Sequence, residues 1–227
     1  MATLVSHGFR AAIFDLDGVL ADSAVLHYAA WRRLADELGI PFDAAANEAL
    51  KGVDRAGSLR LLLRLGNRDV DAATFTALCE RKDGYYRELL ATVTPASLLP
   101  GAAALIDGAR QAGLKLAVAS ASRNAIALLD RLGIAKYFNY IADAAAIAHP
   151  KPAPDIVLAC AAALSIAPGD CIGFEDAVVG VEAIVAAGMA AVGIGDAVTL
   201  GQAHLVFPTT AAVDLARVLV LPRLGFA

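Results

Sequence analysis

Short apolar runs alternate with longer helical stretches from residue 101 to residue 207, and this alternation limits the fold of the chain more than any other feature. Strands that alternate with helices in this way form a parallel sheet. The sequence therefore predicts an α/β fold. In chain order, the expected elements are helix 101–112, strand 116–119, helix 124–132, strand 140–142, helix 152–164, strand 171–174, helix 178–187, strand 190–194 and strand 205–207.

The first part of the chain follows a different pattern. Residues 11–14 are apolar and predict a short buried strand, which we expect to join the same sheet. No strand pattern interrupts residues 22–92. We therefore expect two domains, an α/β core of residues 1–21 and 93–227 and a helical domain of residues 22–92 inserted into it. The helices expected in the insert are 25–38, 44–50, 55–65 and 72–90.

The composition argues against two classes of partner. The formal net charge is −4, and lysine and arginine do not gather on one stretch, so we expect no nucleic-acid partner. The longest uncharged apolar runs, 156–169 and 183–195, are shorter than the roughly 18 residues of a membrane span, so we expect no membrane partner. Three scattered cysteines have neither disulfide nor zinc spacing, and no secretory signal pattern precedes them. We therefore expect a cytoplasmic protein with free thiols.

Two acids follow the first predicted strand. Asp15 and Asp17 come directly after the apolar run 11–14, and Gly18 lets the backbone turn. Ligands of a parallel sheet bind at the carboxyl ends of its strands. Two carboxylates this close repel each other unless a cation or a shared proton separates them. The pair by itself could equally be an exposed turn, because Asp and Gly are ordinary turn residues.

Polar residues also follow the later strands. Ser120 follows the second predicted strand, Lys151 lies in the loop after the third, and Glu175 and Asp176 follow the fourth. Taken singly, a serine can start a helix, an acid pair can face a helix dipole, and a lysine is usually solvated. In a parallel sheet, however, these residues meet Asp15 at one edge. Carboxylates suit Mg²⁺, a lysine and a hydroxyl suit phosphate, and a carboxylate nucleophile can carry a phosphoryl group. This combination predicts a magnesium-dependent phosphoryl-transfer site.

In order and approximate spacing, the four segments Asp15–Gly18, Ser120, Lys151-Pro152 and Glu175-Asp176 resemble the motifs of the haloacid dehalogenase (HAD) superfamily of phosphotransferases. The resemblance spans residues 11–215, and the helical insert resembles the small cap domain of that superfamily. Within the superfamily, the segments around the motifs and in the insert are most similar to the β-phosphoglucomutase family. The resemblance implies the HAD fold, a Rossmann-like parallel-sheet core with an inserted α-helical cap.

The resemblance also implies a role for each site residue. Asp15 would be the nucleophile and Asp17 the general acid and base, while Ser120 and Lys151 would balance charge on the transferring phosphoryl group. Arg55 would hold the phosphate that is not transferred, and Trp31 is expected to pack within the cap. The Mg²⁺ ligands would be Asp15, Glu175, Asp176 and, through its carbonyl oxygen, Asp17. The residues expected to bind substrate are His27, Lys51, Gly52, Val53, Arg55, Ser58, Lys82, Ala121, Ser122, Arg123 and Asn124.

The reaction implied is the interconversion of β-D-glucose 1-phosphate and β-D-glucose 6-phosphate through an aspartyl-phosphate enzyme and β-glucose 1,6-bisphosphate. The protein would act as a monomer whose partners are small sugar phosphates and the bisphosphate. The main alternative is a sugar-phosphate phosphatase of the same fold, because it would share every catalytic acid. A dehalogenase would have no use for Asp17 as an acid, and a phosphonate-cleaving enzyme would need a Schiff-base lysine, for which Lys51 is the formal candidate. The intact acids disfavour a binding module without catalysis.

Overall fold

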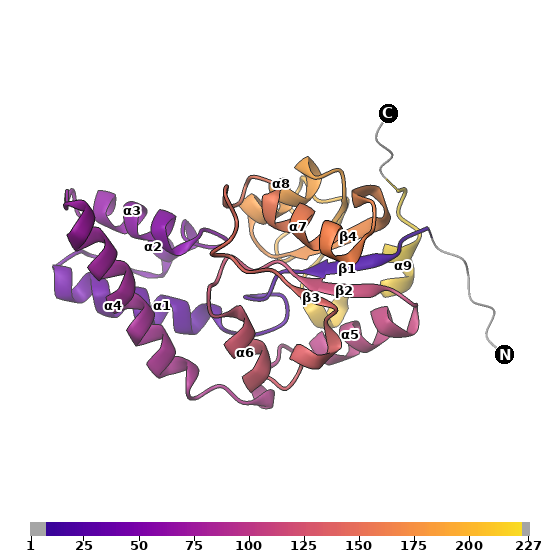
Figure 1. Cartoon of the computed structure of the whole chain (residues 1–227), viewed down its shortest axis with the longest axis horizontal. Coiled ribbons are helices and arrows are strands. Elements are labelled where there is room, and N and C mark those ends of the chain that lie inside the picture. Colours follow the sequence, from indigo (N-terminus) through magenta and orange to yellow (C-terminus); the bar gives the residue numbers. More distant parts are fainter. Residues whose placement is uncertain (1–7, 224–227) are drawn as a thin grey trace.

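The computed structural model describes residues 8–223 of the 227-residue chain and contains a parallel sheet of six strands (Figure 1). The strand bounds are β1 Ala11–Phe14, β2 Lys115–Val118, β3 Tyr140–Ile141, β4 Cys171–Glu175, β5 Ala190–Ile194 and β6 Leu205–Phe207. The strands are ordered β3-β2-β1-β4-β5-β6, and each neighbouring pair is parallel. The first strand of the chain therefore lies inside the sheet, between β2 and β4, where the strand order changes direction. Such a switch point is where ligands bind in open parallel sheets.

Helices cover both faces of this sheet. The core helices are α5 Ala102–Gln111, α6 Ala125–Arg131, α7 Asp155–Leu164, α8 Val178–Ala186 and α9 Leu215–Leu219, and short 3₁₀ helices span Pro95–Ser97, Ala135–Tyr137, Pro168–Asp170 and Thr210–Ala212. α7 and α8 pack on one face, and α5 and α9 lie on the other (Figure 1). Ala12 and Phe14 of β1 belong to the apolar cluster on the α5 side, whereas Ala11 and Ile13 belong to the cluster on the α7 side. Burial on both faces explains why this strand is a continuous apolar run.

The inserted helices form a separate unit, here called the cap, which lies beyond one edge of the sheet (Figure 1). They are α1 Ala24–Leu38, α2 Ala44–Glu48, α3 Arg55–Leu65 and α4 Ala72–Leu90. α1 and α4 pack along each other around an apolar cluster that includes Leu34 and Leu59 and is separate from the clusters of the core. The side chains of Asp43, Asp54 and Asp71 accept hydrogen bonds from first-turn amides of α2, α3 and α4, which fixes where these helices begin. The cap domain therefore has its own apolar cluster, and aspartate side chains fix the N-termini of α2, α3 and α4.

The predicted α/β fold with a helical insert is confirmed, but some boundaries are wrong. The helix predicted from Pro152 begins at Asp155, because the Ala153 amide donates to the Pro150 carbonyl (3.0 Å) and closes a turn there. The helix predicted at 44–50 ends at Glu48, and the sequence does not predict α9. None of the helices within residues 8–223 combines the length and the hydropathy needed to cross a membrane. The domain boundaries at residues 22 and 92 stay a prediction, and residues 1–7 and 224–227 of the predicted core lie outside the described residues.

Candidate active site

Three neighbouring strands bring acids and a hydroxyl to one point of the sheet edge. Asp15 directly follows β1, Ser120 lies just beyond β2, and Glu175 ends β4 with Asp176 after it. The strand pairing continues past β1, since the amide of Asp15 donates to the carbonyl of Phe174 (2.9 Å). The carboxylates are thus placed by backbone hydrogen bonds of the sheet, as expected for the carboxyl ends of parallel strands.

Lys151 joins two of these carboxylates. Its Nζ atom lies 2.7 Å from Asp15 Oδ1 and 2.8 Å from Glu175 Oε2. The residue is only 5% exposed. Burial alone would lower the pKa of Lys151, but the charges of Asp15 and Glu175 outweigh burial and raise it. Lys151 therefore stays charged and brings a fixed positive charge to Asp15.

The acids are held close enough to bind a metal ion. One carboxylate oxygen each from Asp15, Glu175 and Asp176 lie within 4.8 Å of one another. Burial, followed by the charge of Asp15, raises the pKa of Glu175 to about 7. Burial and then Glu175 raise the pKa of Asp176 as well. Three repelling carboxylates with one lysine leave negative charge uncompensated, and an all-oxygen donor set fits a hard cation such as Mg²⁺.

Asp17 has the properties of a group that exchanges protons near neutral pH. Its pKa is raised to about 6, mainly by burial and next by the charge of Asp15. The hydroxyl of Ser23 donates to Asp17 Oδ1, and Nε2 of His27 lies 3.7 Å from the same oxygen. A carboxyl group whose pKa lies close to the working pH can both give and take a proton.

A buried lysine and histidine support Asp17 from the cap. Lys82 Nζ lies 2.9 Å from His27 Nδ1 and faces the rings of Trp31 (4.8 Å) and Tyr86 (5.0 Å). When Lys82 is protonated its ammonium can only donate, so Nδ1 of His27 accepts and the proton of the imidazole sits on Nε2, toward Asp17. Burial lowers the pKa of His27 well below its usual value, and the charge of Lys82 lowers it further. His27 is therefore neutral, and its Nε2 atom faces Asp17 Oδ1 at 3.7 Å, beyond hydrogen-bond distance.

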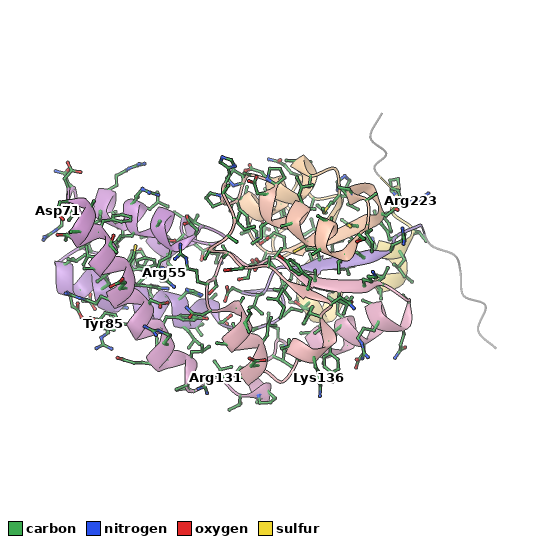
Figure 2. The ribbon with its side chains drawn as sticks, viewed as in Figure 1. Arg55, Asp71, Tyr85, Arg131, Lys136 and Arg223 are labelled. Atoms are coloured by element: carbon green, nitrogen blue, oxygen red, sulfur yellow. The ribbon has the colours of Figure 1, made fainter. Side chains whose placement is uncertain are left out.

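Cap and core together line one pocket, and it contains most of the predicted site. Figure 2 shows Arg55 on the side of the cap that faces the core. The predicted residues that line the pocket are Asp15, Asp17, His27, Lys51, Gly52, Val53, Arg55, Ser58, Lys82, Ala121, Ser122, Arg123, Asn124 and Asp176. Ser120, Lys151 and Glu175 are buried behind the lining residues.

Four lining residues are absent from the predicted site. They are Ala24, Trp31, Asn47 and Leu50. Trp31 is buried in the cap cluster, as predicted, and also borders the pocket. It could have been found, because it lies one helical turn after His27 and so shares its face of α1. Nothing in the residue types of the other three distinguishes them from packing residues.

Comparisons with known proteins show which family the chain belongs to. The family model of the haloacid dehalogenase-like hydrolases matches residues 9–188. A β-phosphoglucomutase of Bacillus subtilis is 41% identical over 208 residues, which cover 91% of this chain and 92% of that protein. A fructose-1-phosphate phosphatase of Escherichia coli is 34% identical over 190 residues, which cover 82% of this chain and 96% of that protein.

A solved structure extends the likeness to three dimensions. The crystal structure of β-phosphoglucomutase from Clostridium difficile is 40% identical in sequence and superposes with a TM-score of 0.90. The match covers 92% of this chain and 95% of that one. The chain therefore belongs to the haloacid dehalogenase-like hydrolase family, and along most of its length it is similar to β-phosphoglucomutases.

Proposed function

We propose that the protein is a magnesium-dependent phosphotransferase that interconverts β-D-glucose 1-phosphate and β-D-glucose 6-phosphate through β-glucose 1,6-bisphosphate. The observation that carries the proposal is a single pocket with Asp15 and Asp17 on its core wall and Arg55 on its cap wall. A sugar with two phosphates needs a reacting carboxylate at one end and a cation at the other. The identity of 41% to a β-phosphoglucomutase supports the same reaction.

The proposed step begins with phosphoryl transfer to Asp15. A carboxylate oxygen of Asp15 attacks phosphorus, the bond from phosphorus to the sugar oxygen breaks, and Asp17 gives its proton to that oxygen. In the next half-reaction Asp17 takes the proton of a second sugar hydroxyl, whose oxygen attacks the phosphorus of the aspartyl phosphate. The bond from phosphorus to the Asp15 oxygen breaks, and the Asp15 carboxylate is the leaving group. Lys151 and the Ser120 hydroxyl compensate charge on the phosphoryl oxygens.

The proposal assigns the magnesium site to the acid cluster at the strand ends. Asp15, Glu175 and Asp176 would hold the ion with their carboxylates, and Asp17 with its carbonyl oxygen. When bound, the ion supplies positive charge for the phosphoryl group in transfer. Lys151 fixes the direction of the Asp15 carboxylate, and the Ser23 hydroxyl orients Asp17.

A sugar-phosphate phosphatase is the second candidate. The 34% identity to a fructose-1-phosphate phosphatase favours it, and both reactions use the same acids. The two differ in the acceptor of the phosphoryl group, which is a sugar hydroxyl in one case and water in the other.

A coupled assay separates the two. The protein is supplied with Mg²⁺, β-D-glucose 1-phosphate and a trace of β-glucose 1,6-bisphosphate, and both glucose 6-phosphate and inorganic phosphate are measured. We expect glucose 6-phosphate to dominate and Asp15→Asn to form neither product. Release of inorganic phosphate as the main product would replace the mutase proposal by the phosphatase.

A further inference from the structure

Asp83 joins the two walls of the pocket without lining it. This residue lies on α4 next to Lys82, and its side chain is 17% exposed. Asp83 Oδ1 accepts from the Arg55 guanidinium of the cap and, at 2.8 Å, from Asn124 Nδ2 of the core. Both partners are among the described residues that line the pocket, whereas Asp83 is behind them.

The second oxygen of Asp83 is also used. Arg87, one helical turn further along α4, lies with its Nε atom 3.3 Å from Asp83 Oδ2. The carboxylate is therefore held from both sides and has little freedom to turn away from Arg55. An exposed ion pair on a helix surface contributes little, but this carboxylate is mostly buried and links residues of α3, α4 and the start of α6.

Asp83 also compensates the charge of Arg55. Burial lowers the pKa of Arg55, the charge of Asp83 raises it, and the charge of Arg123 lowers it. Two arginines that face one pocket repel each other, and Asp83 is the carboxylate in direct contact with one of them. A guanidinium has five donors in a fixed plane, so a bond to Asp83 orients the remaining donors.

We propose that Asp83 is a positioning residue that holds Arg55 and Asn124 together as one binding unit for the phosphate that is not transferred. This inference rests on the proposed function, because it assigns Arg55 to that phosphate. Asp83 acts through Arg55 and Asn124 and does not touch the sugar. Since one partner belongs to the cap and the other to the core, the unit is complete only when cap and core are in contact.

The test compares a donor with two phosphates and a donor with one. In single-turnover experiments, β-glucose 1,6-bisphosphate or acetyl phosphate phosphorylates Asp15, and the concentration for half-maximal rate is measured. For Asp83→Asn we expect this concentration to rise about tenfold for the bisphosphate and to change less than twofold for acetyl phosphate, because only the bisphosphate carries a second phosphate. Glu88→Gln is the matched control. It removes a carboxylate from the same helix whose ion pair with Arg33 (2.8 Å) is exposed, and it should behave as the wild type.

A double variant tests whether Asp83 and Asn124 act through the same contact. Asn124→Ala alone should also weaken binding of the bisphosphate, but it should add little to Asp83→Ala, which already removes the oxygen that accepts from Asn124. Equal effects of Asp83→Asn on both donors, no effect on the bisphosphate, or full additivity of Asp83→Ala with Asn124→Ala would each overturn the inference. These outcomes are independent of the fate of the aspartyl phosphate, so the coupled assay can reject the mutase reaction while the role of Asp83 stands, or the reverse.

Discussion

Two buried lysines of the site carry opposite pKa shifts because their neighbours differ. Lys151 contacts two carboxylates, which raise its pKa. Lys82 contacts a neutral imidazole and two aromatic rings. Burial, followed by the charge of Arg55, lowers the pKa of Lys82 to about 7 despite the nearby Asp17 and Asp83. At neutral pH, Lys151 is always protonated, whereas the surroundings of Lys82 disfavour its protonated form.

The lowered pKa of Lys82 makes the stability of the folded protein depend on pH. The folded-state pKa of Lys82 is about 7 and its ordinary value is 10.5, so the unfolded chain binds more protons between these values. The free energy of unfolding therefore rises with pH across this window, by at most about 1.4 kcal/mol per pH unit. We expect denaturant titrations from pH 7 to pH 10 to show the wild type gaining stability relative to Lys82→Met.

The exposed Lys136, labelled in Figure 2, supplies the control for that experiment. Lys136→Met removes the same charge from the surface and should leave the slope of stability against pH unchanged. Parallel pH profiles for the wild type and Lys82→Met would contradict the lowered pKa.

At the scale of helices and strands, the sequence predicted the residues that the geometry of a parallel sheet must bring together. The carboxyl ends of parallel strands converge, so Asp15, Ser120, Glu175 and Asp176 could be grouped from their positions after apolar runs. Contacts between helices could not be predicted in this way. Whether Lys82 meets His27 depends on the rotation of α4 against α1, and such contacts join residues far apart in sequence.

The turn before α7 shows the same limit. Proline is common in the first turn of a helix, which predicts a start at Pro152. The chain instead closes a turn over residues 150–153, and α7 begins at Asp155. Lys151 lies in this turn, with its side chain buried against Asp15. The general preference of proline for the first turn of a helix does not report such a turn, because the turn depends on contacts with residues far apart in sequence.

Close packing of α8 against β4 fixes the position of Glu175. A Cβ atom on Gly180 of α8 would overlap the Glu175 carboxylate. We expect Gly180→Ala to displace Glu175 from Lys151 and to destabilise the protein by about 3 kcal/mol in chemical denaturation, with loss of phosphoryl transfer.

The same substitution on another helix serves as the control. Gly84 lies within α4, and beyond its chain neighbours and the nearby backbone of α4 no described atom comes within 4 Å of the place where its Cβ would be. Gly84→Ala should therefore stabilise the protein by roughly 0.5–1 kcal/mol through helix propensity. A Gly180→Ala protein as stable and active as the wild type would show that α8 can move away from β4 without consequence.

At the scale of the whole molecule, the pocket depends on two packed units. The cap has its own apolar cluster, and the core has one on each face of the sheet. The proposed nucleophile Asp15 and acid Asp17 come from the core wall, while Arg55, His27 and Lys82 come from the cap wall. Mutations on the core wall should therefore slow transfer from every phosphoryl donor. Mutations on the cap wall should slow transfer from some donors more than from others.

The acid cluster links metal binding to the stability of the whole core. Because Asp15, Glu175 and Asp176 repel one another, we expect Mg²⁺ to stabilise the folded state. At 100 times its dissociation constant an ion adds about 2.7 kcal/mol, which corresponds to about 5–10 °C in melting temperature for a protein of this size. Scanning calorimetry with and without EDTA measures the shift. Asp176→Asn should reduce it strongly, and an unchanged melting temperature in the wild type would argue against a magnesium site here.

The central position of β1 has a consequence for biosynthesis. Ala11 pairs with Lys115 on one side and with Cys171 on the other. During translation the apolar segment 11–14 leaves the ribosome first, then the complete cap, and only afterwards the strands that flank it. Nascent chains therefore carry an unpaired hydrophobic strand until β2 has been made, and a strand with one free side until β4 follows. This interval is when the protein is most exposed to aggregation and most dependent on chaperones.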